Sequence, residues 1–329
     1  MSDPASPPAK RPRPDDQEIV RSSEIWHRDG SLVLQAEGKQ FRVHWGVLSV
    51  HSAFFRDMEG IPQPPDEPKI EGCPVIELSD SAQDLEVVLK SLYNPLFFTQ
   101  KALPLSDIAA HIRLGRKYDL KDLLPTMIER LVHENPRTLE AHNMLKNPHT
   151  GKYAPTHIQP YKAMWIDILT LARENNIFSV LPCAYMRVVM CHSQTVLFDG
   201  VDRPDGTRAT LSPSDQRLCT LARLEISKAQ WNVGNTFGWL ARLALNPNPG
   251  DCLSYSDCMG RKAGFFHAHV IKGSLAPFAS IPHLMDSFHL CEVCTADARL
   301  KMTEGQQKMW DMLPSFFGLP SWADLKDDI

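Results

Sequence analysis

The side chains best suited to chemistry are cysteines in the last eighty residues of the chain. Cys291 and Cys294 form a C-x2-C pair, and Cys252 and Cys258 form a second pair with five residues between them. Thiolates bind zinc directly, and two such pairs supply the four ligands of a tetrahedral site. The sequence thus indicates a candidate zinc site at Cys252, Cys258, Cys291 and Cys294, and a site of this type stabilises a fold without implying catalysis.

Two features of the same region leave other interpretations of this candidate zinc site open. The spacing between Cys252 and Cys258 is wider than the usual two to four residues, and histidines between the two pairs are alternative ligands. Free thiols are the competing interpretation, because cysteine is often buried as a small apolar residue. The histidines are His267, His269, His283 and His289. The cysteines without a partner at useful spacing are Cys73, Cys183, Cys191 and Cys219, which we expect to be core or surface thiols.

Motifs of the common enzyme classes are missing from the sequence. It contains no G-x4-G-K-[ST] phosphate loop, no G-x-S-x-G nucleophile turn and no H-E-x-x-H zinc motif. His267 and His269 share a face only on a strand, and their neighbours do not form a clear strand pattern, so we interpret them as ordinary histidines. We therefore expect no enzyme, with a zinc-dependent enzyme in the C-terminal region as the weakest alternative.

Composition and charge are those of an ordinary soluble protein. The chain has 329 residues, which is long enough for two domains. Hydrophobic residues make up 43% and charged residues 22%, both ordinary values. The net charge of −4 gives no signal for a nucleic-acid partner. No apolar run approaches the roughly 18–20 residues that span a bilayer, and the N-terminus has no apolar signal-peptide segment. We expect a cytoplasmic or nuclear protein whose cysteines are thiols or metal ligands.

The residues before the first apolar pattern are predicted to form an N-terminal tail. Residues 1–22 are rich in proline and charge, so they bury too little surface to offset the entropy of ordering, and we expect disorder there. We interpret the short basic run at 10–13 either as part of a solvated tail or as a nuclear-import signal.

Residues 31–58 then change from a strand pattern to a helix pattern. Short β-prone runs at 32–34 and 41–43 are separated by Glu37-Gly38, and apolar residues from Val47 to Met58 follow at helical spacing. A third strand is predicted at 75–78. Ser81 then caps a helix with Asp84 as its capping-box partner, and helices near 105–112 and 123–131 follow.

This order of motifs resembles the BTB/POZ domain. The matching residues are Phe41-x-Val43-His44, Ser52-x-Phe54-Phe55-Arg56-Asp57-Met58, Tyr93-Asn94-Pro95 and Lys117-Tyr118-Asp119. The resemblance implies a compact α+β protein-binding unit that commonly forms a homodimer, and that in many members docks on a cullin or recruits transcriptional corepressors.

Two positions depart from the transcription-factor type of this family. That type has an acidic residue before the first strand and a basic residue after the F-x-x-H motif, where this chain has Ser31 and Trp45. The departure argues against a corepressor groove of the usual kind. Trp26 and Trp45 are candidate partner anchors, because tryptophan is enriched at interface centres; packing inside the domain is the alternative we favour.

The rest of the chain is predicted to be mainly helical. Residues 135–160 read as a connector, and Ser212, Pro213 and Asp215 form a strong helix start. The C-terminal segment looks like the tail of a large fungal group of BTB/POZ proteins. Its matching residues are Cys252, Cys258, Arg261, Cys291, Cys294, Trp310, Leu313, Pro314, Phe317, Pro320 and Trp322.

The sequence therefore predicts an α+β domain at 23–134 and a mainly helical region at 161–329. The expected function is protein–protein interaction, by an adaptor or scaffold that self-associates and links a cullin-type ubiquitin ligase to a substrate. The alternative is a nuclear regulator of transcription acting through the same domain.

Overall fold

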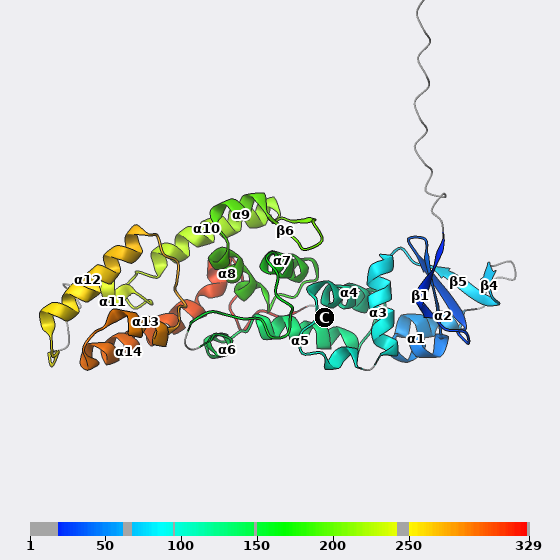
Figure 1. The fold of residues 1–329 in the computed structure, drawn as a ribbon, viewed down its shortest axis with the longest axis horizontal. Coiled ribbons are helices and arrows are strands. Elements are labelled where there is room, and N and C mark those ends of the chain that lie inside the picture. Colours follow the sequence, from blue (N-terminus) through cyan, green and yellow to red (C-terminus); the bar gives the residue numbers. More distant parts are fainter. Residues whose placement is uncertain (1–18, 62–67, 95, 148–149, 242–249, 328–329) are drawn as a thin grey trace, which may run out of the picture. The chain divides into compact units, whose positions relative to one another are not determined.

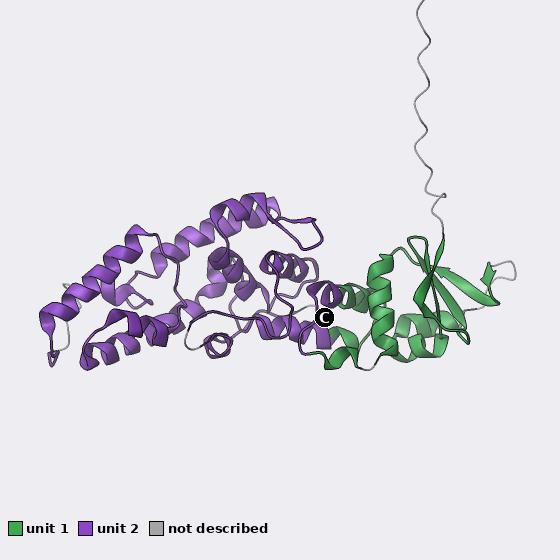
Figure 2. Ribbon diagram, in the orientation of Figure 1, with its two compact units in different colours: residues 1–100, 110–124 green, residues 101–109, 125–329 purple. Residues whose placement is uncertain are grey.

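A computed structural model describes residues 19–61, 68–94, 96–147, 150–241 and 250–327. These residues divide into two compact units (Figure 2): unit 1 comprises residues 1–100 and 110–124, and unit 2 comprises residues 101–109 and 125–329. Helices α4 (Leu105–Lys117) and α5 (Leu123–Glu134) contain residues of both units. The predicted tail at 1–22 falls largely outside the described residues, and strand β1 begins at Val20.

Unit 1 is built on a five-stranded sheet with the order β1-β3-β2-β5-β4. A tight turn at Glu37 and Gly38, both with positive φ (43° and 75°), joins the antiparallel strands β2 and β3. β1 pairs with β3 in parallel, and β5 pairs with β2 in parallel. The strands are β1 (Val20–Trp26), β2 (Leu32–Ala36), β3 (Lys39–Val43), β4 (Lys69–Ile70) and β5 (Cys73–Glu77).

Short helices bury one apolar core against this sheet (Figure 1). Leu34 and Phe41 are fully buried neighbours on β2 and β3, and they belong to one cluster with Leu48 of α1, Phe55 of α2 and Leu89 of α3. Ser81 caps α3, accepting a hydrogen bond from the Asp84 amide, as predicted. The helices are α1 (Trp45–His51), α2 (Ala53–Glu59), α3 (Ala82–Tyr93) and the 3-10 turn η2 (Phe97–Thr99).

Unit 2 is mainly helical, which together with unit 1 confirms the predicted α+β class followed by a helical region. Ser212 caps α10 and Pro213 is its first residue, as predicted. A short helix, α6, lies inside the predicted connector. The elements are α6 (Leu139–Met144), α7 (Met164–Glu174), α8 (Leu181–Cys191), α9 (Gln194–Asp199), β6 (Val201–Asp202), β7 (Arg208–Ala209), α10 (Pro213–Ala229), α11 (Gly238–Ala241), α12 (Tyr255–Ile271), α13 (Ile281–Phe288), α14 (Glu292–Asp311) and η3 (Leu313–Phe317).

Helices α11 to α14 form the part of unit 2 that carries the four candidate metal ligands. Helix α13 packs against both α12 and α14 (Figure 1), and a small apolar cluster around Phe237, Trp239 and Met302 lies among them. Gly305 lets α14 approach the backbone of Asn235 closely, since a Cβ there would lie 2.4 Å from a carbonyl carbon. No helix among the described residues is long and apolar enough to cross a membrane.

Candidate metal centre and protein-binding surface

The starts of two helices bring the four cysteines together. Cys258 lies in the first turn of α12, and Cys252 lies just before this helix. Cys291 is the N-cap residue of α14, and Cys294 lies in its first turn. A C-x2-C pair at a helix start directs both sulfurs to the same side, so the two pairs meet face to face.

The sulfur positions fit one tetrahedral ion. The four Sγ atoms all lie within 4.8 Å of one another, with 3.7 Å between Cys252 and Cys291 and 3.4 Å between Cys252 and Cys294. A zinc–sulfur bond of about 2.3 Å in a tetrahedron places sulfurs about 3.8 Å apart. The donor set and its spacing therefore suit a metal such as zinc.

Backbone amides and burial set the protonation of the sulfurs. A hydrogen bond from the backbone N–H of Cys294 is the main cause that lowers the pKa of Cys291 to about 6. Burial raises the pKa of Cys258 and of Cys294 above the ordinary value, and the Cys291 amide donates to the Cys258 sulfur over 3.4 Å. The lowered pKa favours the thiolate form of Cys291, and a bound cation favours deprotonation of coordinated thiols.

The histidines between the pairs do not join the cluster of four cysteines. His269 Nδ1 bonds to the Phe265 carbonyl, and its ring stacks on Phe265 at 3.7 Å between centroids. The His289 carbonyl accepts a hydrogen bond from Arg261. Four cysteine ligands complete a tetrahedron and leave no position for water, the arrangement of structural rather than catalytic zinc. The remaining cysteines are free; Cys73, Cys183 and Cys219 are buried and Cys191 is exposed.

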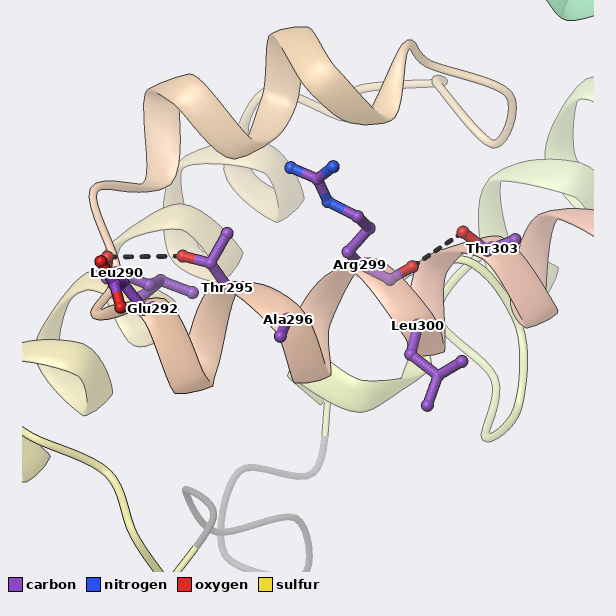
Figure 3. A pocket seen from close by; sticks show the side chains of 7 residues that line it. All are labelled: Leu290, Glu292, Thr295, Ala296, Arg299, Leu300 and Thr303. Atoms are coloured by element: carbon purple, nitrogen blue, oxygen red, sulfur yellow. Dashed lines mark hydrogen bonds between the residues drawn. The ribbon is translucent and has the colours of Figure 1, made fainter.

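A groove of about 680 Å³ runs along α14 next to this cluster (Figure 3). Its charged side chains are Glu292 and Arg299, and Leu300 is 60% exposed. The hydroxyls of Thr295 and Thr303 donate to backbone carbonyls. None of the described residues that line it is a cysteine or a histidine.

A second cluster that the sequence did not indicate lies in unit 2. Fully buried Glu134 accepts hydrogen bonds through Oε1 from the backbone amides of Thr156 (2.8 Å) and His157 (2.6 Å). The ring centroids of His133 and His157 are 3.8 Å apart. One possible metal-donor atom from each of His133, Glu134 and His157 lies within 4.8 Å of the other two. Because Glu134 already holds two backbone donors, we interpret the cluster as an anchor for the 156–158 segment.

The two candidate tryptophans have different surroundings in unit 1. Trp45 is partly buried against the apolar core, and its backbone N–H donates to Ser31 Oγ over 3.0 Å. The two positions that departed from the charged pattern are therefore hydrogen-bonded neighbours. Trp26 ends β1, and the Arg21 guanidinium lies 4.6 Å above its ring.

Exposed apolar side chains mark other parts of unit 1. Val50 at the end of α1 is 71% exposed and Phe54 at the start of α2 is 40% exposed. Val20, on β1 at the edge of the sheet, is 56% exposed. Val50 and Phe54 lie within the apolar pattern predicted for residues 47–58, which gave no signal that they face outward, and Val20 fell within the predicted tail.

Comparison with known protein families identifies one match. Residues 29–135 match the family model of the BTB/POZ domain, the fold of a protein-interaction module. None of the curated proteins compared matches the chain.

Proposed function

Residues 29–135 of this chain form a BTB/POZ domain, and on that premise we propose a self-associating adaptor that holds a protein partner through its helical region. The observation that supports self-association is the exposure of Val50 and Phe54 on two successive helices and of Val20 on an edge strand. Exposed apolar side chains and unpaired strand edges are surfaces that a second chain covers.

The oligomeric state of the full chain tests this proposal. At micromolar concentration, light scattering after size exclusion should give twice the chain mass. Val50→Glu should shift the protein toward monomer, because it places a charge where an apolar contact forms, whereas Leu224→Glu at an exposed site on α10 should leave the mass unchanged. A monomeric wild-type chain would refute self-association.

We further propose that a cullin-type ubiquitin ligase is the complex that the adaptor serves, in the cytoplasm or nucleus. The neutral contact between Trp45 and Ser31 supports this choice over a corepressor role, since it occupies the positions of the charged pair. Co-purification of the full chain with a cullin at micromolar strength is the expected result. Binding to corepressor fragments without cullin binding would favour the transcriptional alternative.

Zinc at the four cysteines is the structural part of the proposal. The support is the spacing of the four sulfurs, which suits a tetrahedral ion. Four cysteine ligands leave no open coordination position, and such a site would stabilise the N-terminal ends of α12 and α14. Elemental analysis of the purified chain should find one zinc per chain. Cys294→Ser should abolish it and Cys191→Ser should retain it, since Cys191 is exposed at the end of α8. Metal-free wild-type protein would refute this part.

A further inference from the structure

Lys146 follows helix α6 and is a partly buried lysine of unit 2. Its Nζ donates hydrogen bonds to the Asn143 side-chain oxygen over 2.9 Å and to the Phe278 carbonyl. An ammonium has three N–H donors, whereas a neutral amine has two donors and one lone pair. The two acceptors therefore match the donors of the neutral amine and leave its lone pair available for reaction.

The groups that act on Lys146 also favour its neutral form. Burial is the main cause that lowers its pKa to about 7, and the positive charge of Arg187 lowers it further, while Cys183 opposes the fall. His142 of α6 interacts with it electrostatically, and the lowered pKa of His142 keeps that ring uncharged. About half of the Lys146 amine is therefore neutral at pH 7. An ordinary lysine with a pKa of about 10.4 is neutral in only about one molecule in 2,500 at that pH.

A cavity of about 290 Å³ gives this side chain room for a small reactant. The cavity is lined by Lys146, by Ser280 and Ile281 at the start of α13, and by Thr303 of α14. Ser280 is the N-cap residue of α13, and its side chain makes no capping hydrogen bond. A helix N-terminus favours negative charge, because its first backbone N–H groups have no partner within the helix. The cavity thus combines an amine with surroundings that suit an anion.

We propose that Lys146 is a carbamate site, at which the neutral amine reacts reversibly with carbon dioxide. The nitrogen lone pair forms a bond to the carbon of CO₂, the electrons of one C–O π bond move to oxygen, and the nitrogen releases one proton to water. The product carries a single negative charge, and nothing is oxidised or reduced. The positive charge of Arg187, which disfavours the ammonium, stabilises the carbamate, as does the start of α13.

Chemical trapping in the full chain tests this proposal. The protein is equilibrated with ¹³C-labelled bicarbonate near neutral pH and alkylated with triethyloxonium ion, which converts a carbamate into a stable ester. Digestion and mass spectrometry then locate the label. Lys146 should carry the labelled ester, and the exposed Lys152 is the internal control that should not. Lys146→Met should abolish the label, whereas Lys152→Met should retain it.

A second measurement on the wild-type chain does not depend on the folding of a variant. The rate at which a small activated ester acylates Lys146 should level off above about pH 7, where the amine has lost its proton. A rate that keeps rising toward about pH 10 would overturn the site, because the side chain would then be an ordinary ammonium at neutral pH. Absence of the carbamate label from Lys146, or equal label at Lys146 and Lys152, would overturn it as well.

Discussion

The apolar cluster of unit 1 buries seventeen described residues, whereas the cluster on the helices that carry the cysteines buries seven. A sheet covered by helices supplies enough apolar area for ordinary stability. The smaller cluster has fewer apolar contacts, and four cysteines meet at the starts of two of its helices. The two regions should therefore respond to different perturbations: unit 1 to cavities in its core, and α12–α14 to removal of the metal.

Loss of a cysteine ligand should produce the largest effect. Structural zinc contributes about 10–16 kcal/mol in zinc-finger peptides, so Cys294→Ser should unfold α12–α14 while leaving the sheet of unit 1 folded. Hydrogen exchange resolved by peptide measures both regions in one experiment. Equal protection of α12–α14 in the variant and in wild type would remove the contrast between the regions.

A cavity in the unit 1 core is the reciprocal test. Leu34→Ala removes a fully buried side chain from the central strand β2 and should cost about 2–5 kcal/mol of unfolding free energy. Urea denaturation measures this loss, and Leu96→Ala at a 68% exposed site is the control. Zinc content should not change; a loss of zinc would show that the two regions are not independent.

Removal of the buried carboxylate of Glu134 should have a smaller effect. Glu134→Ala leaves the amides of Thr156 and His157 without their acceptor, a loss of about 1–3 kcal/mol. Exchange of these two amides should accelerate, and the exposed Glu140→Ala should behave as wild type. Unchanged exchange would contradict the role of Glu134 as an anchor.

Acid should weaken unit 2 through His142 by the smallest amount. Burial is the main cause that lowers the pKa of His142 to about 2, with Lys146 and Arg187 adding to it. The unfolded chain then binds a proton below about pH 6.5 that the folded chain does not, so stability falls by about 1.4 kcal/mol between pH 7.5 and 5.5. Urea denaturation at both pH values measures the fall, and His142→Phe should abolish it; an unchanged fall would assign it to other groups.

Local patterns predicted the elements that depend on neighbouring residues. The turn at Glu37-Gly38 and the caps at Ser81 and Ser212 each use residues within a few positions, and the structure confirms all three. Each cysteine pair was recognisable because its two members lie close together in the sequence. The contact between the two pairs, by contrast, joins residues that are distant in the sequence.

Features that depend on distant residues were not accessible from the sequence. β1 pairs in parallel with β3, and its burial is limited to Ser22 and Ile25, so its residues carry no clean alternation. Glu134 receives its donors from residues 156 and 157, beyond the end of its helix.

The pairing of β2 with β3 has a consequence for the order in which unit 1 folds. These two strands of five residues each form an antiparallel pair closed by a two-residue turn, so they meet at little cost in chain entropy. β1 and β5 then add in parallel to the two outer edges of that hairpin, each through a longer loop. We expect the hairpin at residues 32–43 to be the nucleus, with the other strands joining a template that is already formed.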